Sequence, residues 1–453
     1  MASQKYEQVD SEDIEAPLES EDMHRYFPKF ALFLLGEKLC DAILRRCTKR
    51  QWLVLGLLCV ASMFSKYDLV IFGVCLKQIQ ESLSIDDDEV SYVASIVRLG
   101  ALPAILASIA GDRFGRRKML IFTLIPYTVF TLLTAFSTDK FMFVVFQFLS
   151  RIFIVAELTL SNCTIIEEFD DDNRGWAVGM LGAISALGAG IGLTMFGIIG
   201  GHPAGWRIMF VIGVLPLLAI SWYRRALPET RSFTNASAAG GGAGGEWWRP
   251  VYLLFTMYPR RLLFASSFVF VFNFCLNVAG FYNFKFLQER HGFSPENISM
   301  LGSFGGFFSV CVYVLAGKLS DIRGRKLLTM EFSTAFFITL LCLYNSPHWF
   351  IATLLWVVFM GLDFGVTTII SAFYSELFST SHRSTAAGMY EAVGVIGLTL
   401  GTVMEGAIHA HTHSHWSAIS YTSLPGLFAF LLIIPLPETA SKDLNTISPE
   451  IPV

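Results

Sequence analysis

Long apolar stretches alternate with short polar segments along almost the whole chain. An α-helix crosses the hydrocarbon layer of a bilayer with about 20 mostly apolar residues, and most of these stretches have that length. The pattern therefore predicts an all-α membrane protein with twelve transmembrane helices. Their expected boundaries are 52–76, 90–111, 119–137, 141–165, 176–199, 207–223, 262–287, 298–319, 328–345, 349–375, 386–408 and 417–436.

The composition agrees with this pattern and excludes an ordinary soluble protein. Of 453 residues, 53% are hydrophobic and only 15% are charged, and the mean hydropathy is +0.54. The cysteines lie mostly within the expected spans and show no CxxC spacing, so we interpret them as small buried apolar residues. They are Cys40, Cys47, Cys59, Cys75, Cys163, Cys275, Cys311 and Cys342.

Basic residues gather in alternate polar segments, which predicts the orientation. Lys and Arg are frequent before span 1 and after spans 2, 4, 6 and 8, whereas the other short segments are acidic or neutral. The positive-inside bias then places both termini in the cytoplasm. The acidic residues 1–50 contain no cleavable signal and are expected to form a cytoplasmic tail.

Polar motifs recur at a constant offset of 209 residues, which reveals an internal repeat. "GDRFGRRKML" after span 2 returns as "SDIRGRKLLT" after span 8, and "LPETR" returns as "LPETA". A Glu-x-Phe-x4-Arg motif also occurs twice. The chain is thus expected to hold two six-helix halves, 51–223 and 262–437, joined by the linker 224–261 and followed by a cytoplasmic tail, 438–453. Two such parallel halves with a site between them are typical of transporters that rock one half against the other.

These motifs resemble a known family. The segment 112–118 resembles the loop signature of the major facilitator superfamily, and 321–326 resembles its second copy. The two Glu-x-Phe-x4-Arg motifs and the "LPET" segments are similar to those of sugar porters, organic-ion carriers and metabolite:H+ symporters. "SKYDLVIFGVCL" is similar to the first span of metabolite:H+ symporters, which typically read Asp-Gly-Tyr-Asp; Ser65 and Lys66 replace the first two of these residues.

The loop motifs suggest a gate. Gly115 allows the chain to turn sharply, and a carboxylate such as Asp112 can accept hydrogen bonds from the free N–H groups of a neighbouring helix in one conformation and lose them in the other. The resemblance implies that this helix is span 11. The alternative is that these residues are solvated and only set topology. The predicted gating residues are Asp112, Gly115, Arg116, Glu167, Arg174, Asp321, Gly324, Arg325, Glu376 and Arg383.

Three charges lie deep in the first half. At 1.5 Å per residue, Asp68 and Arg98 lie about 24 and 21 Å from one surface and Arg151 about 15 Å from the other, so we expect the three to meet. Asp68 could carry a proton, with the arginines binding an anionic substrate or tuning that carboxylate. The alternative is a static buried salt bridge. Lys66 points about 200° away from Asp68 around the helix, and its candidate partners are Glu157 and Asp363.

The second half lacks all three charges, because the equivalent positions are Asn277, Phe307 and Met360. Proton and anion chemistry are therefore predicted in the first half. Polar residues on span 7 could recognise the substrate or could bond neighbouring helices. The predicted substrate-binding residues are Lys66, Arg98, Arg151, Asn273, Asn277 and Tyr282.

Two further groups of polar residues carry weaker predictions. Glu391 and Glu405 lie near the ends of span 11, where we expect them to reach water. The alternating histidines of "HAHTHSHW" could bind a transition metal or sense pH, but a flexible solvated loop is the preferred interpretation.

The chain shows no phosphate-binding Gly-Lys-Ser/Thr loop and no HExxH motif, so we expect neither an ATP-driven pump nor an enzyme. The predicted function is proton-coupled symport of a small organic anion. Export by proton antiport and a non-transporting solute receptor are the alternatives. We expect a monomer in the plasma or bacterial inner membrane that needs no cofactor or metal, binds no nucleic acid, and interacts only with its substrate, protons and the bilayer.

Overall fold

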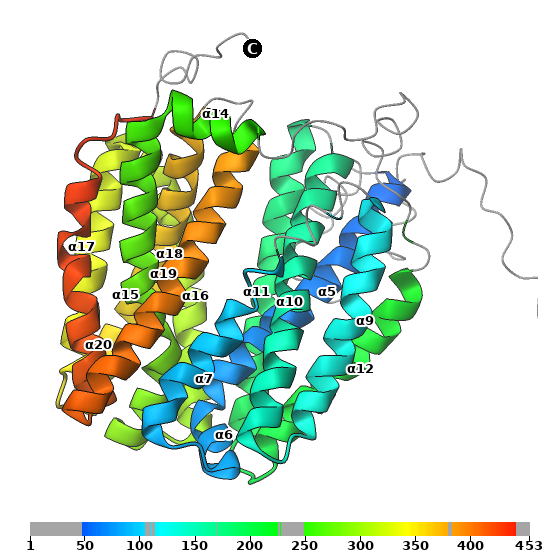
Figure 1. Ribbon diagram of the computed structural model, residues 1–453, viewed down its shortest axis with the longest axis vertical. Coiled ribbons are helices and arrows are strands. Elements are labelled where there is room, and N and C mark those ends of the chain that lie inside the picture. The colour runs from blue at the N-terminus through cyan, green and yellow to red at the C-terminus, as the bar shows by residue number, and fades with distance from the viewer. Residues whose placement is uncertain are drawn as a thin grey trace, which may run out of the picture.

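The computed structural model describes residues 48–104, 110, 114–169, 171–224, 227, 249–378 and 383–440. Within them the chain is overwhelmingly α-helical, and the helices form two bundles side by side (Figure 1). The first bundle contains α5 (Lys49–Val74), α6 (Leu76–Leu83), α7 (Asp87–Leu99), α9 (Arg116–Ala135), α10 (Lys140–Glu168), α11 (Asp171–Ile199) and α12 (Gly205–Tyr223).

The second bundle repeats this order. It contains α15 (Pro259–His291), α16 (Pro295–Arg323), α17 (Arg325–Tyr344), α18 (Trp349–Glu376), α19 (Arg383–Thr412), α20 (His415–Ser423) and the 3-10 helix η4 (Leu424–Leu432). The short helix α14 (Arg249–Met257) precedes it. Figure 1 shows α14 across one end of the bundle, the end at which α5 and α15 begin. We call this the termini end and the opposite one the far end.

Ten of these helices are long and apolar enough to cross a membrane. They correspond to all the predicted spans except 90–111 and 417–436. In the first of these, α7 covers 13 residues and then runs toward residues outside the described ranges. In the second, α20 continues directly as η4. The protein is therefore a multi-pass membrane protein, with ten of twelve predicted spans seen as single long helices.

Local signals explain where the helices begin. Thr48 and Gln51 form a reciprocal capping box at α5, and the side chain of Asp139 accepts a hydrogen bond from the N–H of Met142 at 2.8 Å at α10. Ser294 caps α16, whose first residue is Pro295. Caps of this kind satisfy the N–H groups that a helix start leaves free.

The structure confirms the internal repeat. Helices α9 and α17 begin at Arg116 and Arg325, 209 residues apart, and each follows a glycine with positive φ. These glycines are Gly115 at φ 96° and Gly324 at φ 104°, a region that residues with a side chain rarely adopt. Each half therefore makes the same turn at the same point of its chain.

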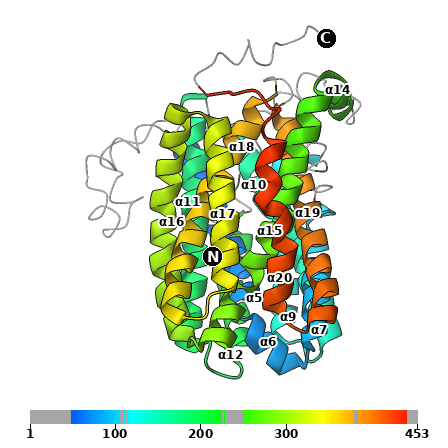
Figure 2. The same ribbon diagram turned by 90° about the vertical axis from the view of Figure 1, so that its left-hand side faces the viewer.

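The two halves meet along three pairs of helices: α7 with α19, α11 with α16, and α5 with α15. Figure 2, turned by 90°, shows α11 beside α16 and α7 beside α19. Large aromatic residues from both halves share one buried core, in which Phe72 of α5 contacts Phe281 of α15 with ring centroids 5.3 Å apart. The helices that line the space between the halves are thus fixed by packing at the far end.

Gly324→Ala should lower the thermal unfolding midpoint of the purified protein by several degrees. The positive φ strains any residue with a Cβ, at a cost of about 1–2 kcal/mol, and the added atom would lie 2.7 Å from Oε2 of Glu438. Gly306→Ala is the matched control, because an added Cβ there meets nothing within 4 Å in a helix that alanine favours. Equal midpoints for the two variants would contradict this account.

Candidate functional site

Asp68 lies inside the first half. Its residue is 4% exposed, and its Oδ2 accepts a hydrogen bond from the Thr131 hydroxyl of α9 at 3.0 Å. That hydroxyl also lies 2.9 Å from the hydroxyl of Ser150 on α10. The neighbouring Tyr67 donates to the carbonyl of Met209 on α12 at 2.9 Å. This face of α5 therefore packs against its own half.

The expectation that Asp68 would meet the two arginines is wrong. Its described hydrogen-bond partners are uncharged, and its Oδ1 has none in the described part of the chain. The Asp68 side chain points toward α9 and α12, whereas Arg98 points toward the second half. Asp68 is thus a buried carboxyl group held by hydroxyls.

Lys66 lies on the opposite side of α5 and is exposed, although it sits in the middle of a spanning helix. The charges of Arg151 from α10 and Glu391 from α19 both act on it. Among the described residues, neither Lys66 nor Arg151 has a hydrogen-bond or ion-pair partner, and the buried Nε of Arg151 is unsatisfied. Two cations of the first half thus have no bonded counter-ion in the described part of the chain.

Neither partner predicted for Lys66 contacts it. Glu157 instead forms a fully buried ion pair with Arg224, whose Nη1 lies 2.8 Å from Oε2. The hydroxyl of Thr123 also donates to Glu157, at 3.2 Å. Asp363 lies on α18 and forms no ion pair with Lys66 in the described part of the chain. The acidic group near Lys66 is Glu391, whose position sequence reasoning had assigned to the surface.

Arg98 joins the halves at the far end. Its Nη1 donates to Oγ1 of Thr402 on α19 at 2.7 Å, and its guanidinium lies 4.3 Å from the ring centroid of Phe281 on α15. About two turns away on α7, the hydroxyl of Ser91 shares a 2.7 Å hydrogen bond with Tyr282 and donates to Glu405. Arg98 and Tyr282 therefore belong to the contact between the halves.

Charged residues extend this contact to the far surface. The fully buried ammonium of Lys285 lies 2.8 Å from Oδ1 of Asp87. Burial acts to raise the pKa of Asp87, but the hydrogen bond and charge of Lys285 outweigh it and lower that pKa to about 2. Asp87 therefore stays ionised at physiological pH and holds α7 against α15.

The histidine-rich segment also takes part in this contact, so the expectation of a flexible loop is wrong for two of its members. Helix α19 continues to Thr412, and α20 begins at His415. His409 lies 2.9 Å from Asp88, and His415 lies 2.8 Å from Glu405, while the two rings stack at 3.9 Å. Among the described residues no group of three or more metal-binding side chains is found.

Glu405 is fully buried and does not reach water as expected. His415 and Ser91 supply the hydrogen bonds that water would otherwise provide.

The asparagines of span 7 bond mainly within their own half. Asn273 donates to the carbonyl of Val269, and Asn283 accepts from the indole of Trp356 at 3.2 Å. The side chain of Asn277 lies outside the described residues. The contacts of Asn273 and Asn283 match the alternative to substrate recognition, which is hydrogen bonding between and within helices. Asn273 also lies beside Gly394 of α19.

Ion pairs occur at matching positions at the termini end of both halves. Arg116 pairs with Glu167 at 2.9 Å, and Arg325 pairs with Glu376 at 2.9 Å. Oε1 and Oε2 of Glu438 accept hydrogen bonds from the first two N–H groups of α17, at 2.9 and 3.1 Å. The repeat thus extends to side-chain contacts.

Several predicted gating groups cannot be placed. Asp112 and the side chains of Arg174, Asp321 and Arg383 lie outside the described residues.

The hydrogen bonds between halves for which both partners are described all lie toward the far end. They join Gln78 and Val74 to Gln288, Asp87 to Lys285, Asp88 to His409, Ser91 to Tyr282 and Glu405, and Arg98 to Thr402. In this conformation the bundle is closed at the far end, and the level of Lys66 lies on the termini side of the closure.

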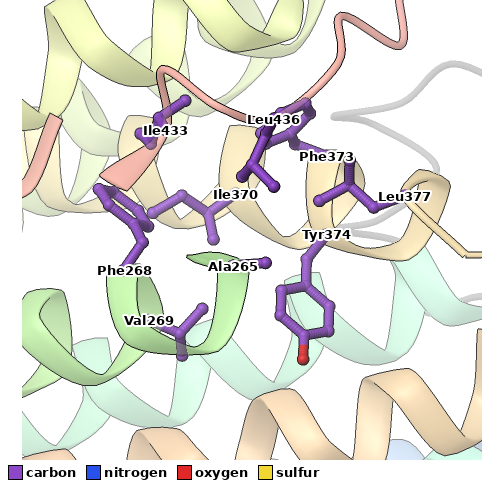
Figure 3. A pocket seen from close by; sticks show the side chains of 9 residues that line it. All are labelled: Ala265, Phe268, Val269, Ile370, Phe373, Tyr374, Leu377, Ile433 and Leu436. Carbon is purple, nitrogen blue, oxygen red and sulfur yellow. The ribbon is translucent and has the colours of Figure 1, made fainter. Parts of the chain in front are cut away.

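A small apolar cavity at the termini end is not the substrate site. Figure 3 shows its lining side chains on α15, α18 and the chain around η4, with the phenol oxygen of Tyr374 directed away from the group. All of them belong to the second half. They are Ala265, Phe268, Val269, Ile370, Phe373, Tyr374, Leu377, Ile433 and Leu436. A site served by rocking halves must contact both.

The family model of the Major Facilitator Superfamily matches residues 58–371 and 280–450, which together cover almost all of the chain. The chain belongs to the major facilitator superfamily. It is therefore a membrane-embedded transporter and not an enzyme, as the motifs predicted.

Curated relatives in this superfamily share between a fifth and a quarter of their residues with the chain. A putative niacin/nicotinamide transporter of Bacillus subtilis is 22% identical over 81% of this chain and 90% of its own. The benzoate transport protein of Acinetobacter baylyi is 21% identical, over 89% and 93%. The 3-(3-hydroxy-phenyl)propionate transporter of Escherichia coli is 24% identical, over 80% and 88%.

Solved structures of the superfamily have the same fold. A D-xylose-proton symporter superposes with a TM-score of 0.70 at 15% identity, over 86% of this chain and 99% of its own. The Escherichia coli xylose transporter in its inward-open conformation also gives 0.70 at 15% identity, over 87% and 98%.

A cysteine pair at Gly197 and Ser299 should form a disulfide on mild oxidation of a variant without native cysteines. A Cβ at Gly197 would lie 2.5 Å from that of Ser299, across the far end of α11 and α16. A disulfide holds the two Cβ atoms roughly 3.5–4.5 Å apart, so the pair should form once the two helices relax apart by about 1 Å. Mass spectrometry of the linked peptides would measure the yield.

The matched control is a pair at Gly179 and Gly317, on the same two helices near the termini end. A Cβ at either position meets nothing within 4 Å, so little disulfide is expected. A higher yield for the control pair would contradict the far-end closure.

Proposed function

We propose that this protein carries a small organic anion together with a proton across its membrane by alternating access. The observation that supports this proposal most strongly is the pair of cations, Lys66 and Arg151, without a described bonding partner between the two halves. Both lie in the middle of spanning helices. A carboxylate would satisfy both.

The energetic argument is direct. A charged side chain in the middle of a membrane costs roughly 3 kcal/mol or more unless water or a counter-ion compensates it. Lys66 and Arg151 also repel each other, since each bears a positive charge. A bound anion would remove both costs, and it would be reached from the termini end while the far end is closed. The related transporters support this substrate class, because benzoate, muconate and gallate are all carboxylates.

Asp68 is the proposed proton carrier. The ionised form of a buried carboxyl group without a cation is costly, whereas the protonated form is not. The Thr131 hydroxyl, which also bonds to Ser150, can donate to ionised Asp68 or accept a hydrogen bond from its protonated form. The lysines and arginines of the polar segments support a cytoplasmic termini end, so the proposed direction is release of both proton and anion into the cell.

The ion pairs Arg116–Glu167 and Arg325–Glu376 are proposed to belong to a gate that closes the termini end when the far end opens. Asp112, Asp321, Arg174 and Arg383 would complete it. Since both walls of the site come from one chain, a monomer suffices.

Lys66→Gln should lower uptake of labelled benzoate into proteoliposomes by roughly ten- to a hundredfold in kcat/KM, because a charge-assisted hydrogen bond to substrate is worth about 1.5–3 kcal/mol. The same uptake assay is run with labelled niacin and labelled 3-(3-hydroxyphenyl)propionate, each with an inward proton gradient imposed. Lys318→Gln removes an exposed lysine of α16 and is the matched control.

Asp68→Asn should lower the acceleration of uptake by the gradient, because it removes the proton that Asp68 carries. Binding of these acids without flux would favour a receptor. Accumulation only under the reversed gradient would favour an exporter. If gradient-driven uptake by the Asp68→Asn variant is unimpaired, Asp68 is not the proton carrier.

A further inference from the structure

We propose that Glu391 is a second proton-binding carboxyl group, directly linked to the substrate because it and the substrate anion compete for Lys66. This inference rests on the proposed transport of an anion. In the empty carrier Lys66 is balanced by ionised Glu391; in the loaded carrier it is balanced by the substrate, and Glu391 takes up a proton.

The position of Glu391 on α19 directs it toward the first half. Eleven residues separate it from Thr402, which places both within about 20° on the same face of the helix. Thr402 accepts the hydrogen bond of Arg98, so this face is the one that meets the first half. Ile396, about 140° away, is exposed and marks a different side.

Glu391 also lies at a level where the halves are not joined. It is three turns, about 16 Å, nearer the termini end than Thr402, and its side chain is exposed. No ion pair between Glu391 and Lys66 is formed in this conformation, although each charge acts on the other. Lys66 and Glu391 are both exposed, so neither is enclosed by the other.

Few other titratable groups surround Glu391. Tyr390 precedes it on α19, and Asp363 and Tyr374 of α18 lie near Tyr390. Helix α15 contributes the uncharged Asn273 opposite Gly394. Among the described residues, Lys66 is the one cation whose charge acts on Glu391. The cation that balances Glu391, Lys66, is therefore also the cation that would bind the substrate.

The linkage follows from the number of charges. A substrate carboxylate bound to Lys66 and Arg151 would bring a second negative charge beside Glu391, and a like charge nearby favours the protonated form of a carboxyl group. Glu391 then changes from carboxylate to carboxylic acid while the substrate stays ionised. One anion and one proton enter together, so the net charge of the site is the same in the empty and the loaded carrier.

The sign of the pH dependence is defined by this exchange. Because binding takes up a proton, substrate affinity should fall as pH rises above the protonation point of Glu391 in the loaded carrier, by up to tenfold per pH unit. Asp68 has no described contact with Lys66 or Arg151 and should not contribute to this slope.

The experiment measures binding to the purified full-length protein by isothermal titration calorimetry between pH 5 and 9, using whichever of benzoate, niacin and 3-(3-hydroxyphenyl)propionate binds the wild type most tightly. Titration in buffers of different ionisation enthalpy counts the protons taken up. The wild type should take up close to one proton in the range where affinity falls. Glu391→Gln should take up none and should bind with a pH-independent affinity.

Three variants separate this linkage from a structural role. Glu391→Asp should restore the slope, whereas Asp363→Asn and Asp68→Asn should keep it. If Glu391→Gln binds with the wild-type slope and proton uptake, the inference is wrong while anion transport stands. If the wild type binds none of the acids, the proposed substrate class itself fails.

Discussion

The cost of placing charge in a low-dielectric layer organises this transporter. Most charges in its bundles are neutralised in pairs: Arg224 with Glu157 inside the first half, and Lys285 with Asp87 between the halves. Each such pair holds particular helices together. Among the described residues, Lys66 and Arg151 have neither an ion pair nor a hydrogen bond. Unpaired cations would destabilise a protein with no ligand. In a transporter that must attract an anion, they can form the binding site.

Features that depend on local sequence could be predicted well. The spans followed from runs of apolar residues, and the repeat was visible because the turn at Gly115 and Gly324 needs the same residue in both halves. The pairing of charges could not be predicted equally well. Depth follows from a constant rise per residue, but the direction of a side chain depends on how its helix is rotated against its neighbours.

That difference explains the errors in the site. Asp68 faces α9, where Thr131 holds it, and does not meet the arginines. Glu391 is exposed as expected, but its closeness to the charge of Lys66 could not be read from its position near the helix end. His415 was expected in a loop because histidine is polar, but a buried carboxylate and a stacked ring make it part of the core.

The buried pair of Glu157 and Arg224 has a further consequence when the two halves are compared. The equivalent positions in the second half, 209 residues later, hold Val366 and Ile433, which are equally buried. The same packing problem is solved by an ion pair in one half and by aliphatic contact in the other. Losing one member of a buried pair leaves an uncompensated charge and costs about 3–5 kcal/mol, whereas Ile→Val costs roughly 1 kcal/mol. A substitution of Glu157 or Arg224 is therefore tolerated only together with a change of its partner. Val366 and Ile433 can each be replaced by a similar aliphatic residue independently.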